Sequence, residues 1–396
     1  MDIYSTLRPD HITGLLQTTK NAVRVLSPDD FGSAFAEICA WDGYAPTPLH
    51  GLQGLASRLG IDRIDYKHEG PRFGLGSFKA LGGSYAAQHV LSRVLSQQLE
   101  QPVSLLDIRN GEHAQAVGEI TLVSATDGNH GRSLAWGCQR FGARCRIYIH
   151  AEVSENRARA MRDLGADVVR IDGNYDASVA LARQEAEDNG WFVVSDTSWP
   201  GYTDAPRDVM AGYGVMTREA CAALALPPTH VFLQGGVGGL AASVSAFVHQ
   251  YWPKAPPRII VVEPARAACL FESARAKKPV TVEITQETIM AGLSCGEPSG
   301  LAWEILAEQV SDFLTIADEL VGPTVRLLAR PIENDPVIEA GESAVAGLAA
   351  LIAVRQDAEF SAELDLNAGS RVLLFGSEGV TDPEIFAAIM AGSDHG

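Results

Sequence analysis

The chain has 396 residues, of which 46% are hydrophobic and 20% are charged. This composition supports a large buried core and about two domains, and it excludes general disorder. The formal net charge of −18 repels phosphate backbones, so nucleic acid is not expected as a partner. Any anion that the protein binds has to be small and held locally.

No apolar run reaches the roughly 18–20 residues that a membrane helix needs, so no membrane partner is predicted. The N-terminal segment has no basic region followed by an apolar one, as a secretory signal would. The six cysteines form no Cys-x-x-Cys motif, and no metal site is predicted. A cytoplasmic protein with reduced thiols is expected, although pairing of Cys269 with Cys295 stays open.

Apolar, β-branched runs alternate with helical patterns in chain order. Strands are predicted at 121–124, 145–149, 167–171, 192–194, 231–233, 259–262 and 372–375, and helices at 133–141, at 154–164 and after 239. Continuous apolar runs indicate strands that are buried on both faces, as in a parallel sheet. We therefore expect an α/β protein with right-handed crossovers, and polar surface excursions at 98–119 and 356–368.

A lysine opens a predicted helix directly after a glycine turn, in Gly74-Leu75-Gly76-Ser77-Phe78-Lys79. The positive end of the helix dipole and partial burial both disfavour the ammonium form of Lys79. The neutral amine can form a Schiff base with a carbonyl compound. The alternative is an ordinary solvated lysine on a helix.

A second turn, Ser124-Ala125-Thr126-Asp127-Gly128-Asn129-His130-Gly131, follows a strand and opens a helix. Backbone N–H groups at such a place can point at an anion. The alternative is a capped turn, with Asp127 or Asn129 as the cap and His130 in a structural role.

The third turn is Gln234-Gly235-Gly236-Val237-Gly238-Gly239, between a strand and a helix. Its density of glycines predicts a phosphate cradle. Gly236-x-Gly238-x-x-Ala241 also fits a dinucleotide fingerprint, with Glu263 ending the next strand. A nicotinamide-dependent oxidoreductase therefore remains an alternative at this point.

A fourth site is Asp196, at the carboxyl end of the strand 192–194. Open α/β sheets bind their ligands at such ends, although a turn aspartate is the simpler interpretation. Together and in this order, the four segments resemble the fold-type II pyridoxal-phosphate enzymes, within the tryptophan synthase β and serine dehydratase-like superfamily.

The resemblance is closer to the diaminopropionate ammonia-lyase family, and it runs over nearly the whole chain. It is most specific in the stretches 73–83, 125–132, 289–298 and 334–336, supported by 341–343, Asp196-Thr197 and Gly201-Tyr202. Serine dehydratases commonly have serine before Gly-Asn-His-Gly, where this chain has Asp127. A serine or threonine dehydratase, and a binding protein that kept the fold, remain alternatives.

The resemblance implies two α/β domains with parallel sheets and pyridoxal 5′-phosphate in the cleft between them. The larger domain would be 1–84 plus 197–396, and the smaller 85–196. It further implies cleavage of D- and L-diaminopropionate to pyruvate and two ammonia, and a homodimer. The residues that would bind the cofactor are Lys79 as a Schiff base, Phe78, Asn129, Gly235, Gly236, Val237, Gly238, Gly239 and, at the pyridine nitrogen, Ser377.

The resemblance assigns substrate binding to Ser77, Thr126, Asp127 and His130. The two isomers point their Cα protons to opposite faces of a planar intermediate, and one base cannot reach both faces. An enzyme that accepts both isomers therefore needs two bases. By the resemblance, Asp127 serves the D-isomer and Asp196 the L-isomer.

Overall fold

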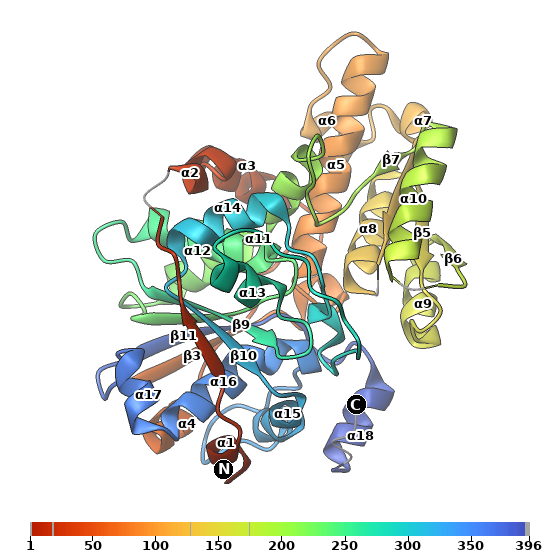
Figure 1. Ribbon diagram of the computed structural model, residues 1–396. Helices are drawn as coiled ribbons and strands as arrows, with labels where there is room; N and C mark the ends of the chain where they lie inside the picture. The colour runs from red at the N-terminus through yellow and green to blue at the C-terminus, as the bar shows by residue number, and fades with distance from the viewer. Residues whose placement is uncertain (1, 18–19, 127, 174, 393–396) are drawn as a thin grey trace. The chain divides into compact units, whose positions relative to one another are not determined.

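The computed structural model describes residues 2–17, 20–126, 128–173 and 175–392 (Figure 1). The chain forms two compact units. The first consists of Met1–Pro28, Pro46–Ser77 and Met216–Gly396, and the second of Asp29–Ala45 and Phe78–Val215. No helix in the described ranges has the length and apolarity needed to cross a bilayer.

The first unit contains a seven-stranded sheet in the order β1-β10-β9-β8-β11-β3-β2. Its central strands run parallel, and β1 and β2 join the edges antiparallel. The strands are β1 (Asp10–Thr13), β2 (Leu49–Gly51), β3 (Arg63–His68), β8 (His230–Gln234), β9 (Arg258–Pro264), β10 (Asp312–Ile316) and β11 (Arg371–Gly376). The apolar runs predicted as buried strands form β8, β9 and β11, which confirms the parallel α/β class.

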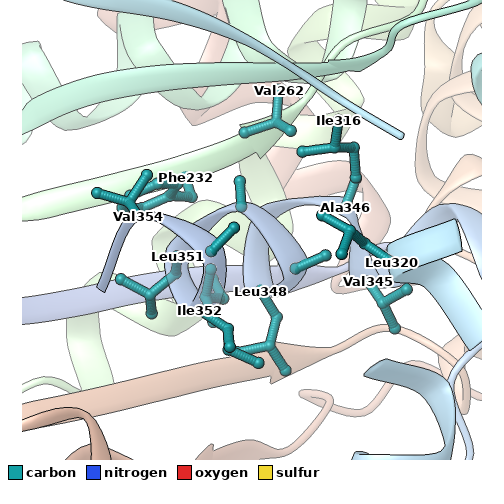
Figure 2. Close-up of a cluster of buried hydrophobic side chains, with 14 of the residues drawn as sticks. Phe232, Val262, Ile316, Leu320, Val345, Ala346, Leu348, Leu351, Ile352 and Val354 are labelled. Atoms are coloured by element: carbon teal, nitrogen blue, oxygen red, sulfur yellow. The ribbon is translucent and has the colours of Figure 1, made fainter. Parts of the chain in front are cut away.

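Helices cover both faces of this sheet. The apolar helix α16 (Ala346–Arg355) packs across β8, β9, β10 and β11, and Figure 2 shows Leu348, Leu351 and Ile352 with Phe232 and Val262 in this core. On the other face lie α12 (Gly239–Tyr251) and α13 (Cys269–Ala276), as Figure 1 shows. Because both faces are covered, the strands need continuous apolar sequence.

The first unit contains further helices, of which α14 (Gly300–Gln309) packs on α12 and α2 (Asn21–Val25). The others are α1 (Asp2–Thr6), α4 (Gln53–Leu59), α15 (Val321–Ala329), α17 (Ala358–Glu363) and α18 (Pro383–Met390), with single 3₁₀ turns η1 (Arg72–Gly74), η2 (Ala291–Leu293), η3 (Asp318–Leu320) and η4 (Glu342–Val345). Part of the excursion predicted at 356–368 is thus helical, because Asp357 caps α17 through the N–H of Phe360.

The second unit contains a four-stranded parallel sheet in the order β6-β5-β4-β7. Its strands are β4 (Thr121–Ala125), β5 (Arg144–Ile149), β6 (Asp167–Arg170) and β7 (Phe192–Val193). Its helices are α5 (Lys79–Gln98), α6 (Leu105–Asn110), α7 (Ala114–Val117), α8 (Asn129–Phe141), α9 (Glu155–Arg162) and α10 (Tyr175–Asn189). Helices α3 (Pro28–Ile38) and α11 (Asp204–Ala223) also belong to it over most of their length.

Two expectations for this unit differ from the structure. Helix α8 begins at Asn129 instead of 133, directly after the turn. The segment predicted as an excursion at 98–119 forms α6 and α7, because Ser104 and Asp107 make a capping box and Ile108 and Val117 are buried.

The limits of these two units differ from those of the predicted domains, 1–84 plus 197–396 and 85–196. The predicted domain limits stay a prediction. Helix α5 belongs to the second unit from its first residue, and not from residue 85. The reason is close packing against α8, where a Cβ on Gly83 would lie 2.7 Å from Ser133 Oγ and one on Gly137 would lie 2.8 Å from Ser84 Cα.

Candidate active site

Lys79 is the first residue of α5, as predicted. The turn before it has positive φ at Phe73, Gly74 and Gly76 (51°, 70° and 80°). These left-handed conformations reverse the chain between η1 and α5, and glycine adopts them without steric cost. The turn thereby places Lys79 at the N-terminus of the long helix α5.

Glycines in the first turns of α5 bring other helices close to Lys79. A Cβ on Gly82 would lie 2.4 Å from the Tyr213 ring of α11, so only glycine fits there. The hydroxyl of Ser133 on α8 donates to the carbonyl of Lys79 at 2.6 Å. The glycines after the lysine therefore serve helix packing and fix the backbone of Lys79.

Within the second unit, the side chains of Lys79, Asp196 and His130 come together. Lys79 Nζ donates a hydrogen bond to Asp196 Oδ2. His130 is buried, bonds the Val194 carbonyl through Nε2 at 2.8 Å, and turns Nδ1 toward Asp196 Oδ2 at 3.9 Å. Asp196 lies in the loop after β7, so the predicted carboxylate does lie beside the predicted lysine.

Burial and neighbouring charges set the protonation states of Asp196 and His130. Burial alone would raise the pKa of Asp196, but the charge and the hydrogen bond of Lys79 outweigh it and hold that pKa well below its usual range. Burial also lowers the pKa of His130, against the opposing effect of Asp196. Asp196 is therefore an ionised carboxylate and can act as a base, beside a neutral imidazole. Lys79 Nζ and this carboxylate form an ion pair.

Two further residues of the predicted turn 124–131, Thr126 and Asn129, lie just before and at the start of α8. Thr126 is buried and its hydroxyl oxygen accepts from the N–H groups of Gly128 at 3.2 Å and Gly131 at 3.4 Å. Asn129 opens α8, whose N-cap is Gly128 and carries no side-chain cap. Asp127, predicted as the second base, lies outside the described residues.

Phe78 and Tyr213 form an aromatic wall beside Lys79. Their ring centroids are 4.5 Å apart, and Lys79 Nζ lies 5.8 Å from the Phe78 centroid. Burial raises the pKa of Tyr213 far above its usual value, so its hydroxyl stays protonated near the Lys79 cation. Sequence reasoning missed Tyr213, because a single tyrosine inside a helical pattern carries no signal of its contacts.

In the first unit, the glycine-rich turn joins β8 to α12. A Cβ on Gly235 would lie 2.6 Å from Glu263 Cγ, and Gly238 has φ +97°. At Gly236 the nearest atom to a Cβ would be Cys295 Sγ at 3.4 Å, which is ordinary contact. Close packing thus explains Gly235, and the positive φ explains Gly238, but neither explains Gly236, whose lack of a side chain leaves its backbone open to a ligand.

The N–H groups of this turn meet the requirement for an anion site. Within the described residues, the amides of Gly236, Val237, Gly238 and Gly239 have no hydrogen-bond acceptor. They precede or begin α12, where the helix dipole is positive. These four amides could take a phosphate group, whereas the N–H of Gly235 already donates to the Val262 carbonyl at 2.7 Å. The phosphate role predicted for residues 235–239 stays a prediction.

Glu263 does not act as a dinucleotide-binding acid. Its carboxylate accepts from the N–H groups of Leu270 at 3.0 Å and Phe271 at 2.7 Å, and so caps α13. Burial raises the pKa of Glu263 to about 8, although these N–H groups work against the rise. Cys269 and Cys295 are not joined by a disulfide in the structure.

Ser377 follows β11 and is buried. Its hydroxyl oxygen lies 3.3 Å from Gln234 Nε2, whose nearer acceptors are the carbonyls of Phe375 at 2.5 Å and Ala344 at 3.1 Å. Because an amide nitrogen only donates, this contact leaves the Ser377 hydroxyl proton for a further acceptor. Gln234 was not singled out from the sequence, although it stands directly before the glycine turn.

Ser77 and Glu378 form an isolated antiparallel bridge. The side chain of Glu378 turns toward η4, where Oε1 accepts from the N–H of Ser343 at 3.1 Å. Glu378 therefore accepts from a backbone N–H, whereas the neighbouring Ser377 hydroxyl keeps a proton to donate.

Comparison with known proteins agrees with this chemistry. The family model "Pyridoxal-phosphate dependent enzyme" matches residues 40–375. The chain therefore belongs to the family of pyridoxal-phosphate dependent enzymes, which excludes the nicotinamide alternative. It is similar to diaminopropionate ammonia-lyase of Escherichia coli K12, with 38% identity over 89% of both chains.

Solved structures agree over 98% of both chains at 34% identity. They are crystal structures of E. coli diaminopropionate ammonia lyase, one in complex with the aminoacrylate-PLP azomethine reaction intermediate (TM-score 0.87) and one in complex with D-serine (TM-score 0.89). The predicted fold-type II class, the family and the cofactor are confirmed.

Proposed function

We propose that this enzyme is a carbon–nitrogen lyase that converts 2,3-diaminopropionate and water to pyruvate and two ammonia, acting on both the D- and the L-isomer. The observation that carries this proposal is 38% identity to the E. coli enzyme along 89% of both chains. The acidic Asp196 beside Lys79 supports it, because this arrangement suits a substrate with a second cationic amine.

The chain's residues are suited to hold pyridoxal phosphate. The N–H groups of residues 236–239 would take the phosphate, Lys79 would hold the cofactor as an imine, Phe78 and Asn129 would flank it, and the Ser377 hydroxyl would meet the pyridine nitrogen. When bound, the cofactor supplies an electron sink for a carbanion at Cα. A neutral hydroxyl partner leaves the pyridine nitrogen unprotonated, which makes this sink weaker than a pyridinium.

Proton transfer is assigned to two carboxylates and the lysine. Asp196 removes the Cα proton of the L-isomer, and Asp127 that of the D-isomer. The β-ammonium leaves as ammonia with the electron pair of the Cβ–N bond, and Lys79 or one of the aspartates assists this departure. A β-ammonium beside an aspartate gains a charge-assisted hydrogen bond worth about 1.5–3 kcal/mol, and a serine hydroxyl gains less.

Substrate binding is assigned to Ser77, Thr126, Asp127 and His130. In the structure the imidazole of His130 is neutral and bonded to the backbone, so its part is to shape the pocket around Asp196. Access of a D-amino acid is supported by the D-serine complex of the E. coli enzyme.

The decisive experiment compares pyruvate and ammonia production from D- and L-diaminopropionate with production from D- and L-serine and L-threonine. We expect the diaminopropionate isomers to have the higher kcat/KM, with two ammonia for each pyruvate. Faster turnover of serine or threonine, with one ammonia for each pyruvate, would favour the dehydratase alternative instead.

We further propose a homodimer located in the cytoplasm. None of the six cysteines forms a disulfide, as expected in a reducing compartment. The dimer rests on the family resemblance, and light scattering after size exclusion at several concentrations tests it.

A further inference from the structure

Asp196 has no regular secondary structure to hold it, because β7 ends at Val193. A base must nevertheless be held within a fraction of an ångström of the proton that it removes. The loop 194–202 therefore has to be fixed by other contacts, and Tyr202 makes the ones that matter.

The hydroxyl of Tyr202 forms two hydrogen bonds to the backbone before Asp196. It donates to the Val193 carbonyl at 2.9 Å and accepts from the Ser195 N–H at 2.9 Å. Burial raises the pKa of Tyr202 well above its usual value, so the phenol keeps the proton that the first of these bonds needs.

These bonds complete the pairing of two successive peptide groups. The N–H of Val194 donates to the Val123 carbonyl of β4 at 2.8 Å, and the Val194 carbonyl bonds His130 Nε2 at 2.8 Å. With the two bonds of Tyr202, all four polar groups of the peptides 193–194 and 194–195 have partners. The chain enters Asp196 in one fixed direction.

The ring of Tyr202 is held as firmly as its hydroxyl. It stacks on Trp199 with centroids 4.0 Å apart and an interplanar angle of 14°. The guanidinium of Arg183 on α10 covers the other face of Trp199, with Cζ 3.6 Å from the ring centroid. Backbone bonds in both directions between Trp199 and Tyr202, across a turn with Gly201 at φ +85°, close the loop.

We propose that Tyr202 is the positioning residue of Asp196, and that the stack of Arg183, Trp199 and Tyr202 sets the place at which the carboxylate meets Lys79. This inference rests on the proposed function, since it takes Asp196 as the base for the L-isomer. Its consequence is selective: loss of the Tyr202 hydroxyl impairs the L-isomer and spares the D-isomer.

The test uses the holoenzyme of Tyr202→Phe, which keeps the stacked ring and removes only the hydroxyl. Tyr148→Phe is the matched control, because Tyr148 is a buried tyrosine of the same unit whose hydroxyl bonds Glu185. For Tyr202→Phe we expect kcat on L-diaminopropionate to fall about tenfold to a hundredfold, with KM changed less than about twofold. Turnover of the D-isomer should stay within about threefold, and the control should match wild type on both.

A second readout does not depend on activity. Amide hydrogen exchange of the segment 192–203 should be slow in wild type and faster in Tyr202→Phe, with unchanged exchange in α10. Trp199→Leu, which removes the stacking partner and leaves both hydrogen-bonding groups, should give a smaller change in the same direction.

Equal loss on both isomers, no loss on either, or unchanged exchange in Tyr202→Phe would overturn the proposal. If wild type turned over neither isomer of diaminopropionate, the proposed function would fail, and with it the selective consequence. The exchange measurement would then still decide by itself whether Tyr202 fixes the backbone before Asp196.

Discussion

The carboxylate of Asp196 accepts a hydrogen bond from the ammonium of Lys79, although 117 positions separate the two residues in the chain. One comes from a loop after a strand and the other from the first residue of a helix. Their contact places a carboxylate directly beside the lysine proposed to carry the cofactor.

Replacement of either carboxylate should remove one isomer from the substrate range. We expect Asp196→Asn to lower kcat on L-diaminopropionate by about 10²–10⁴-fold, the range of a lost general base, and to spare the D-isomer. Asp127→Asn should do the converse. Steady-state pyruvate assays on each pure isomer measure this, and equal losses on both isomers in both variants would contradict the division between the two bases.

Lys79→Ala should abolish covalent attachment of the cofactor. The variant should lack the absorption band that borohydride removes in wild type, and turnover should fall by about 10²–10⁴-fold because a proton carrier is also lost. Lys278→Ala, at an exposed lysine, is the control and should keep both band and activity. After borohydride treatment of wild type, peptide mapping should find the added mass on the peptide with Lys79. Attachment to another lysine would refute the assignment.

Two adjacent glycines should respond differently to alanine. Gly235→Ala puts a methyl group 2.6 Å from Glu263 Cγ, so the free energy of unfolding of the apoenzyme should fall by about 1–3 kcal/mol. At Gly236 the nearest atom lies at 3.4 Å, so Gly236→Ala should fold normally. Its Kd for pyridoxal phosphate should nevertheless rise about tenfold or more, because the methyl blocks approach to the backbone N–H groups.

Urea unfolding and titration of the cofactor band separate the two effects. A Gly236→Ala variant with wild-type affinity would show that the phosphate does not approach this turn. An equally destabilised Gly236→Ala variant would contradict the steric argument for Gly235.

The buried Glu263 predicts a pH dependence of stability. Its pKa is raised to about 8 in the folded chain from 4.5 in the unfolded one. Between these values the folded state keeps a proton that the unfolded state loses. The free energy of unfolding of the apoenzyme should therefore fall with rising pH in this window, by about 1.4 kcal/mol per pH unit from this group.

Glu263→Gln removes this contribution, so its stability should fall less steeply than that of wild type between pH 5 and 8. Urea unfolding at several pH values measures both slopes. Glu283→Gln, at an exposed glutamate that does not contact Glu263, is the control and should keep the wild-type slope. If Glu263→Gln had the wild-type slope too, the raised pKa would be wrong.

Local sequence was sufficient for the class of the fold and for much of the site. Continuous apolar runs identified β8, β9 and β11, and the glycine turns located both the lysine at the start of α5 and the phosphate turn before α12. These features depend on residues close together in the chain, where burial pattern, backbone conformation and helix start are encoded. The order of the motifs was enough to indicate the family.

Short elements outside these motifs were less predictable. The capping box of α6 is a local signal, but the segment around it is polar and its few buried side chains depend on distant partners. Helix α8 begins directly at Asn129 because the turn packs onto it, with a Cβ on Gly131 only 2.4 Å from Thr126 Cγ2.

Only the tertiary structure decided which polar groups meet. The sequence allowed Glu263 as a ribose-binding acid, and folding turned it onto the N-terminus of α13 instead. In the same way, the partnership of Gln234 with Ser377 and that of Tyr202 with the backbone before Asp196 came only from the structure. Side-chain partners far apart in the chain, or across a loop, are set by packing and by the need to pair buried polar groups. Residue types and their order along the chain do not by themselves indicate these side-chain partners.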